Sequence, residues 1–208
     1  MDGETSDLRR VRRRQGRGLA FFLGFLRHPN LVGSVIPSSR FLERRLVDIA
    51  AAANAKLVVE LGPGTGGTTR AILDALPGDS RLLALEVDPE FVALLRSEAD
   101  SRLIVHLGSA MDLNEVLALY RLPQPDVVVS GIPFSTMPLT VGRKILGEVW
   151  DCLAPGGRFI AYQFRDRVAI LGRKLIGRPD IEVELLNAPP MRVYHWRKPA
   201  VSHPAESA

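Results

Sequence analysis

The sequence predicts an α/β fold in which a doubly wound, mostly parallel sheet follows N-terminal amphipathic helices and ends in an antiparallel strand pair. From residue 57 onward, short apolar runs alternate with helical stretches, which is the order of a parallel sheet covered by helices on both faces. The chain has 208 residues, 46% of them hydrophobic, enough for one sizeable core. We therefore expect one domain over residues 31–198, a separate basic segment over 1–30 and a disordered tail over 199–208.

The first segment is basic and amphipathic. Seven arginines and no acidic residue lie between Leu8 and Arg27, and on a helical wheel most of them fall opposite the large apolar residues. Such a helix can insert its apolar side at the headgroup boundary while its arginines meet lipid phosphates. We expect residues 8–27 to bind an anionic membrane surface. The alternative is a helix packed on the domain core with its basic face in water.

The remaining elements follow in chain order. Residues 30–39, after Pro29, are predicted to form a loop, and Ser38 or Ser39 can cap a helix that runs to about Ala53. Each apolar run that comes next has the length of a buried strand, and the last two are separated by a Pro-Pro segment that suits an edge hairpin. The predicted strands are 57–61, 81–87, 103–107, 127–129, 158–162, 182–186 and 192–196.

Charge and cysteine content exclude several classes of protein. The net charge is +4, but both ends are basic and residues 51–157 are acidic, which indicates that the ends meet an anionic partner, either a nucleic acid or a lipid surface. A single cysteine, Cys152, excludes a disulfide framework, and with 4 histidines no metal site is expected. No run reaches the roughly 18 apolar residues that cross a bilayer, so we expect a cytoplasmic protein, peripheral on the inner face of the cell membrane.

A glycine-rich turn follows the first strand. Glycines at Gly62, Gly64 and Gly66 let the backbone turn tightly and approach a ligand closely. Glu86 ends the next strand, where an acid can accept hydrogen bonds from ribose hydroxyls. A nicotinamide dinucleotide site would need G-x-G-x-x-G, and this spacing departs from it.

The pattern Glu-x-Gly-x-Gly-x-Gly that begins at Glu60 resembles motif I of the class I S-adenosylmethionine-dependent methyltransferases. The resemblance continues at residues 85–88 (LEVD), 108–112 (GSAMD) and 153–157 (LAPGG), so it covers about residues 56–162. It implies the Rossmann-like fold of that class, with S-adenosylmethionine as cofactor and S-adenosylhomocysteine (SAH) as product.

Carried over by position, the resemblance assigns cofactor contacts. The glycines of the turn would line the methionine and sugar part, Glu60 would face the sulfonium side, and Glu86 would bind the ribose. The adenine would be bordered by Val87 and Asp88, with Ser109 and Ala110 near its amino edge. For Asp88 and Ser109 the alternative is a turn or helix-cap residue.

The fourth strand ends in Ser130-Gly131-Ile132-Pro133-Phe134, where amino-methylating members of the class carry Asn/Asp-Pro-Pro-Tyr. In those enzymes a polar side chain and a backbone carbonyl hold the target nitrogen, and an aromatic residue stacks beside it. The resemblance thus places Ser130, Gly131, Ile132 and Pro133 at the transfer site, with Ser130 also at the cofactor and Phe134 beside the substrate. Serine is a weaker acceptor than Asn or Asp, which argues against recognition of a nucleobase.

This segment, residues 33–39 (GSVIPSS), residues 188–194 (APPMRVY) and the basic helix resemble the bacterial phospholipid N-methyltransferases. These enzymes methylate phosphatidylethanolamine stepwise to phosphatidylcholine, and the resemblance spans about residues 20–198. It implies a phospholipid substrate. We expect no nucleic-acid partner, and a monomer because nothing in the sequence indicates a dedicated interface. One alternative is an enzyme like the ribosomal RNA adenine dimethyltransferases, which carry a C-terminal helical RNA-binding domain. The other is a catalytically silent S-adenosylmethionine-binding membrane adaptor, which has no need of both Glu60 and Glu86.

The chemistry of an amine acceptor adds further candidates. Methyl transfer needs a neutral nitrogen, and a primary ammonium with a pKa of roughly 10 is protonated at pH 7, so a proton acceptor is needed. The quaternary product suits aromatic faces, and the lipid phosphate suits a cation. The candidates are Tyr194 and His195 as base, Phe134, Tyr162, Phe164, Tyr194 and Trp196 around the headgroup, and Arg165, Arg167 and Arg192 for the phosphate.

Overall fold

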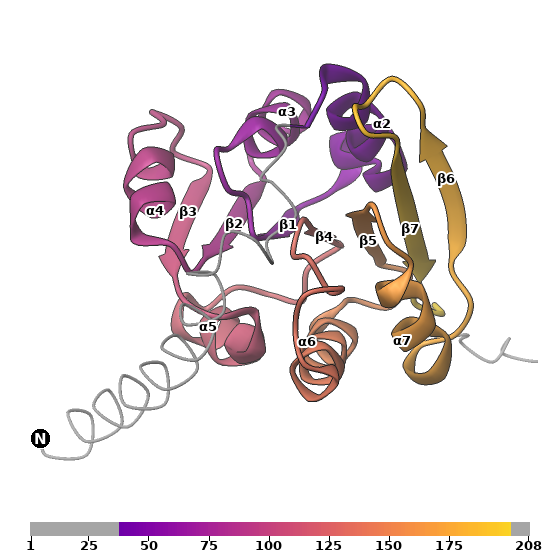
Figure 1. The fold of residues 1–208 in the computed structure, drawn as a ribbon. Coiled ribbons are helices and arrows are strands. Elements are labelled where there is room, and N and C mark those ends of the chain that lie inside the picture. Colours follow the sequence, from indigo (N-terminus) through magenta and orange to yellow (C-terminus); the bar gives the residue numbers. More distant parts are fainter. Residues whose placement is uncertain (1–37, 201–208) are drawn as a thin grey trace, which may run out of the picture.

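The computed structural model describes residues 38–200, which form a seven-stranded sheet between two layers of helices (Figure 1). The strand order is β3-β2-β1-β4-β5-β7-β6. The first five strands are parallel, β7 is antiparallel to β5, and β6 is antiparallel to β7. The doubly wound, mostly parallel sheet is confirmed. Its strands are β1 Leu57–Leu61, β2 Arg81–Glu86, β3 Leu103–Leu107, β4 Val127–Ser130, β5 Arg158–Gln163, β6 Asp180–Glu184 and β7 Met191–Arg197.

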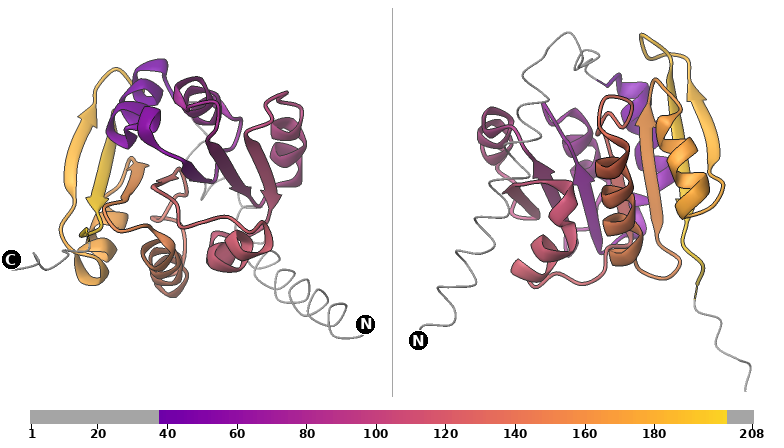
Figure 2. Two further views of the ribbon diagram at one scale, coloured as in Figure 1. Left: turned by 180° about the vertical axis from the view of Figure 1, so that it is seen from behind. Right: turned by 60° about the horizontal axis from the view of Figure 1, so that its bottom comes forward.

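The helices cover both faces of the sheet. Helices α2 and α3 pack on one face, whereas α5, α6 and α7 pack on the other, and α4 lies against β2 and β3 (Figures 1 and 2). Two short 3-10 helices, η1 and η2, join helices to strands. The bounds are α2 Arg40–Ala50, η1 Ala52–Asn54, α3 Gly67–Ala75, α4 Pro89–Arg96, η2 Ala110–Asp112, α5 Leu113–Leu119, α6 Leu139–Cys152 and α7 Arg167–Leu175.

The central strands form because their apolar runs are buried on both faces. Every residue of β1 and of β4 is buried, which is what a parallel strand under two helix layers requires. Burying each valine or leucine side chain contributes about 1.5–3 kcal/mol. The only polar side chains in these two strands, Glu60 and Ser130, stand at or next to their carboxyl ends.

Helix α2 begins at the serine pair that the sequence offers as a cap. The Ser39 hydroxyl accepts a hydrogen bond from the Leu42 N–H (3.2 Å), so the prediction of a Ser38 or Ser39 cap is confirmed at Ser39. The helix ends at Ala50 because Ala51 takes a left-handed conformation with φ 49°. Residues 52–54 then continue as η1 rather than as part of the helix.

The terminal antiparallel strand pair is confirmed, but β6 ends two residues earlier than predicted. Strand β6 ends at Glu184 and not at residue 186, because the Glu184 carboxylate accepts the N–H of Leu186 (2.9 Å) and turns the chain. Leu185 and Leu186 therefore lie in the turn of the hairpin. Strand β7 inserts between β5 and β6, so β6 is the edge of the sheet.

Some predictions fall outside the described residues. The basic helix over 8–27 and most of the tail over 199–208 are among them, so the segment boundaries and the membrane contact of residues 8–27 stay predictions. Among residues 38–200, no helix combines the length and apolar character needed to span a membrane.

Candidate functional site

The candidate site lies where the chain leaves β1 and β4, two neighbouring strands at the centre of the sheet. The strand order reverses here: β2 and β3 continue the sheet beyond β1, and β5 continues it beyond β4 on the other side. In open α/β sheets, ligands bind at the carboxyl ends of the strands where the strand order reverses. Gly62 donates its N–H to the carbonyl of Leu85 (2.9 Å), and Gly131 donates to that of Leu61 (2.9 Å). These bonds fix the paths of the two loops that form the site.

The glycines of these loops let the two backbones meet. Gly62, Gly64 and Gly66 have positive φ angles of 70°, 55° and 82°, a region that disfavours other residues. A Cβ on Gly131 would lie 2.9 Å from the Gly62 carbonyl oxygen and 2.5 Å from the Tyr162 hydroxyl. The loop after β1 thus has no side chain at three positions. A cofactor can therefore approach its backbone closely, as the motif predicts.

Glu60 is a buried carboxylate with one free oxygen. It is fully buried, its Oε2 accepts a hydrogen bond from the Thr69 hydroxyl (2.6 Å), and its Oε1 has no partner. Burial, assisted by the charges of Glu86 and Glu43, raises the pKa of Glu60 to about 7 against the lowering effect of the Thr69 bond. An unpartnered carboxylate oxygen is unfavourable in a core unless a ligand uses it. It fits a cationic group such as the amino group or sulfonium of S-adenosylmethionine.

Glu86 holds the glycine loop to the end of β2. Its Oε2 accepts the N–H of Gly64 (3.0 Å), and its Oε1 accepts those of Val87 (2.7 Å) and Asp88 (3.0 Å). Burial raises the pKa of Glu86, while these three backbone bonds act in the opposite direction. A carboxylate offers about four acceptor positions, so one remains for a ribose hydroxyl, and that contact stays a prediction.

The predicted adenine side consists of capping residues. The Asp88 carboxylate caps α4 by accepting the Glu90 N–H (2.8 Å), and the Ser109 hydroxyl caps η2 by accepting the Met111 N–H (3.2 Å). Val87 and Ala110 are buried beside them. Asp88 and Ser109 therefore act as helix caps, which is the alternative that the sequence left open. Contacts of these two residues, and of Val87 and Ala110, with a cofactor stay predictions.

The loop after β4 is held by a glutamine that the sequence reasoning missed. Ser130 is buried, and its hydroxyl accepts the Ile132 N–H at 3.4 Å. The Ile132 carbonyl accepts the Phe134 N–H (3.0 Å) and the side-chain amide of Gln163 at the end of β5. Both lone pairs of that carbonyl are thus in use, so a substrate nitrogen can bind it only by displacing a donor. A polar residue at a strand end was the one available signal for Gln163.

Two predicted substrate residues lie inside the core. Phe134 is fully buried, and a Cβ on Gly142 of α6 would lie 3.4 Å from its ring. Tyr194 is 1% exposed. Burial raises the pKa of Tyr194, which opposes a role as proton acceptor near neutral pH. Contact of either residue with a substrate would require the surrounding core to open.

Tyr162, in contrast, lies where the loops meet. Its hydroxyl is 3.5 Å from that of Thr68 in the first turn of α3, and the Ser38 side chain lies near it. Burial and the charge of Glu60 raise the pKa of Tyr162 to about 12, so the hydroxyl is protonated at physiological pH. The structure thus brings Tyr162 together with Glu60, Gly131 and the glycine loop.

The predicted phosphate-binding arginines surround the end of β5. Arg165 and Arg192 are exposed, Arg167 is half-buried, and Arg192 donates to the carbonyl of Phe164 (3.1 Å), whose side chain is exposed as well. They are therefore accessible to an anion at the same edge of the sheet as the glycine loop. Their contact with a phosphate stays a prediction.

His195 and Trp196 have structural partners elsewhere. The His195 imidazole is 3.7 Å from the Glu182 carboxylate of β6, and its strand is three strands away from Glu60, about 14 Å at the usual strand spacing. Trp196 is buried, stacks on Phe159 with ring centroids 5.2 Å apart, and donates its indole N–H to the Gly177 carbonyl (2.9 Å). The structure does not bring either one to the loops of the site.

Known proteins resemble both the sequence and the fold. A family model described as a methyltransferase domain matches residues 58–157. An ornithine lipid N-methyltransferase from Singulisphaera acidiphila is 39% identical over 141 residues, which are 66% of this chain and 73% of that protein. A ribosomal RNA small subunit methyltransferase A from Maricaulis maris is 37% identical over 91 residues, which are 42% of this chain and 29% of that protein.

Among solved structures, the O-methyltransferase from Bacillus cereus in complex with SAH superposes with a TM-score of 0.65 at 16% identity, over 86% of this chain and 90% of that one. The N-methyltransferase NodS from Bradyrhizobium japonicum gives a TM-score of 0.62 at 15% identity, over 85% of this chain and 97% of that one. The sheet order with its antiparallel β7 is the class I methyltransferase fold. With a relative at 39% identity covered over 73% of its length, the chain belongs to the class I S-adenosylmethionine-dependent methyltransferases.

Proposed function

We propose that the protein transfers methyl groups from S-adenosylmethionine to the amino headgroup of a membrane lipid. The substrate we propose is phosphatidylethanolamine with its mono- and dimethyl forms, leading to phosphatidylcholine. The observation that carries the proposal is the match to a relative named for N-methylation of a lipid. An ornithine lipid and phosphatidylethanolamine both offer a primary amine, so the chemistry of transfer is shared.

The residues of the site suit an in-line transfer to an amine. The cofactor supplies a methyl group on a positively charged sulfonium. The free Oε1 of Glu60 stabilises positive charge at that side of the site, since it is buried and has no other partner. The Tyr162 hydroxyl, protonated because its pKa is raised to about 12, can accept a hydrogen bond from an amine N–H through its oxygen and so position a neutral nitrogen.

Two observations favour a lipid over RNA. The match to the ornithine lipid N-methyltransferase covers 73% of that protein, whereas the matches to ribosomal RNA small subunit methyltransferases A cover between 29% and 49% of those proteins. The position that Asn or Asp holds in base-methylating enzymes is Ser130, which is fully buried and accepts from the backbone. Ribosomal RNA therefore serves as the competing acceptor in the test.

The test is a transfer assay with methyl-labelled S-adenosylmethionine and the full chain. Vesicles of phosphatidylethanolamine with phosphatidylglycerol, the same vesicles with ornithine lipid instead, and ribosomal RNA are offered separately. We expect label in mono-, di- and trimethylated phosphatidylethanolamine. Label only in ornithine lipid would correct the headgroup, and label only in RNA, with cofactor binding intact, would overturn the proposal.

A further inference from the structure

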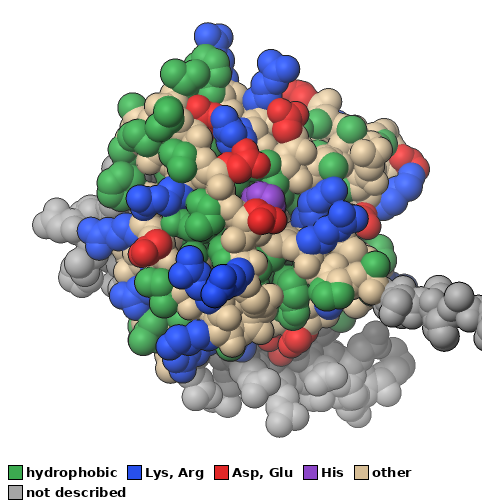
Figure 3. All heavy atoms as spheres, turned by 90° about the vertical axis from the view of Figure 1, so that its right-hand side faces the viewer, with side chains coloured by type: hydrophobic (Ala, Val, Ile, Leu, Met, Phe, Trp, Pro, Cys, Tyr) green, Lys and Arg blue, Asp and Glu red, His purple; other side chains and the backbone are tan. Residues whose placement is uncertain are grey.

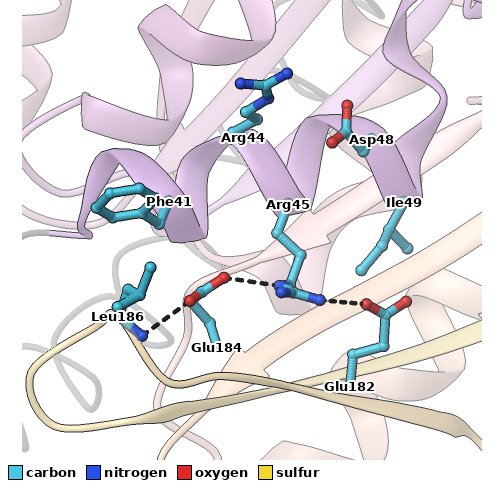
Figure 4. Close-up of a pocket in the computed structure, with 8 residues that line it drawn as sticks. All are labelled: Phe41, Arg44, Arg45, Asp48, Ile49, Glu182, Glu184 and Leu186. Atoms are coloured by element: carbon cyan, nitrogen blue, oxygen red, sulfur yellow. Dashed lines mark hydrogen bonds and ion pairs between the residues drawn. The ribbon is translucent and has the colours of Figure 1, made fainter.

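The edge of the sheet that carries the site also carries the most exposed apolar side chains of residues 38–200. Leu185 and Leu186, in the β6–β7 turn, are 72% and 64% exposed, and Phe164, after β5, is 57% exposed. Phe41, in the first turn of α2, is 42% exposed and lines a hollow of about 570 Å³ together with Leu186 (Figure 4). Scattered exposed apolar residues are common, but several gathered at one edge mark an interaction surface.

The strand register places these residues beside the transfer site. Strand β7 runs back from the carboxyl end of β5, where Arg192 pairs with Gln163, so the β6–β7 turn lies at the edge where β4 and β5 end. The turn is also tied to the site, because the Asn187 side chain accepts the N–H of Ser39 (2.9 Å). The neighbouring Ser38 side chain lies near the Tyr162 hydroxyl and helps to lower its pKa against the effect of burial.

Exposed charges near these residues are mainly positive. Arg40 stacks over the Phe41 ring at 5.1 Å, and Arg165 and Arg192 are exposed next to Phe164. The exposed acids near them are Asp166 and Asp48, the second of which lines the same hollow as Phe41 and Leu186. Figure 3 shows this side of the molecule, with hydrophobic and basic side chains interspersed toward one edge.

The two carboxylates of β6 behind the turn share one arginine. Arg45 of α2 lies between two acids of β6, with its Nη1 2.7 Å from Glu182 and its Nε 2.8 Å from Glu184 (Figure 4). The bond from Arg45 lowers the pKa of Glu184, and the bonds to both acids raise the pKa of Arg45. Arg45 therefore offsets one of the two negative charges that these acids would present to an anionic surface at the turn.

We propose that this edge, which we call the apolar rim (Phe41, Phe164, Leu185 and Leu186, with Arg40, Arg165 and Arg192), inserts into the headgroup region of an anionic bilayer. The proposal rests on the proposed function, since the rim brings the transfer site to the headgroup of a lipid that stays in its membrane. Leucine and phenylalanine enter the boundary of the acyl chains, while arginines on the same surface meet lipid phosphates. The rim is distinct from the basic segment over residues 8–27.

An environment-sensitive fluorophore at Leu186 tests this proposal in the full chain. The only native cysteine, Cys152, is buried, so Leu186→Cys can be labelled selectively. The matched control is Leu119→Cys, which is also exposed (51%) but ends α5, near the start of β4 at the opposite edge of the sheet. Vesicles are equal parts phosphatidylglycerol and phosphatidylethanolamine, with or without nitroxide-labelled lipid.

We expect the probe at Leu186 to shift to the blue on vesicle binding and to be quenched by nitroxide lipid, while the probe at Leu119 stays in water. A Leu186 probe that stays in water while the protein sediments with vesicles, an equal response at both positions, or no sedimentation would overturn the proposal. A blue shift that needs only higher protein concentration would overturn it in favour of a second copy of the chain.

A second variant separates this surface from the transfer chemistry. Leu185→Asp/Leu186→Asp should lower turnover on vesicles by at least about tenfold and leave turnover unchanged on short-chain phosphatidylethanolamine below its micelle concentration. An equal loss of turnover on vesicles and on the short-chain lipid would contradict the proposed insertion of the apolar rim. If the wild-type chain methylates no lipid in either form, the proposed function fails, and the Leu186 probe still decides whether the rim inserts.

Discussion

At the residue scale, the unpartnered oxygen of Glu60 leads us to predict that the affinity for a cofactor depends on the charge of the cofactor. Glu60→Gln keeps an acceptor for Thr69 but removes a buried charge. We expect S-adenosylmethionine, which carries a sulfonium, to bind about tenfold more weakly, and SAH, which carries a neutral thioether, to bind nearly as before. Isothermal titration with both ligands checks this. An equal loss for both would show that Glu60 acts on the amino group that both ligands carry, or on the shape of the site, and not on the sulfonium.

Gly131 offers a prediction with a matched control. In Gly131→Ala the new Cβ would meet the Gly62 carbonyl oxygen at 2.9 Å, which a side-chain rotation cannot relieve, so the two loops must separate. Overpacking of this kind costs about 1–3 kcal/mol, and we expect SAH affinity to fall by about tenfold or more. In the control, Gly147→Ala in α6, the Cβ meets nothing within 4 Å, and SAH affinity should be unchanged. Wild-type affinity in Gly131→Ala would contradict the close approach.

At the scale of elements, Asn187 joins the β6–β7 hairpin to α2. Its side chain is buried, accepts the Ser39 N–H (2.9 Å) and donates to the Pro189 carbonyl (2.9 Å). Asn187→Ala leaves the partly buried Ser39 N–H and Pro189 carbonyl without this partner, so we expect the free energy of unfolding to fall by about 1–3 kcal/mol. The exposed Asn114, which bonds to Glu148, supplies the control Asn114→Ala, with a loss below about 1 kcal/mol. Denaturant titration of both variants compares them.

The sequence predicted the central elements because burial alone decides them. Apolar runs such as β1 are buried on both faces, and only the centre of the sheet removes all of their side chains from water. The edge strand β6 was displaced by two residues because its outward side chains, Ile181 and Val183, are about half exposed, so the apolar pattern does not mark its end. A side-chain bond from Glu184 ends it instead, and such a bond leaves no trace in hydropathy.

The candidate site, too, was predicted only in part. The glycines and acids of the motif could be placed because strand, turn and helix follow one another in the chain. The contact of Gln163 with the Ile132 carbonyl and that of Tyr162 with Thr68 join residues 31 and 94 positions apart. They depend on which strands are neighbours and on where side chains point, so the sequence named Tyr162 only as an aromatic candidate and missed Gln163.

At the scale of the whole molecule, folding buries a carboxylate that would be ionised in the unfolded chain, and this makes stability depend on pH. The pKa of Glu60 is about 7 in the folded state and about 4.5 in its ordinary range. Between these values the folded state binds more protons than the unfolded state. Stability without cofactor therefore falls as pH rises from about 4.5 to about 7, by up to about 3 kcal/mol from this group alone.

Glu60→Gln should remove that part of the slope. Exposed ion pairs such as Lys56 with Asp79 are the same in both proteins, so the difference between wild type and variant isolates Glu60. We expect denaturant titrations at intervals from pH 4.5 to 7.5 to give a difference in unfolding free energy that grows with pH in favour of the variant. Adding S-adenosylmethionine to the wild type should reduce this difference, because its positive charge stabilises the ionised carboxylate, whose Oε1 has no partner in the folded protein. A difference that stays constant across this range would mean that Glu60 titrates in the folded protein as it does in the unfolded chain.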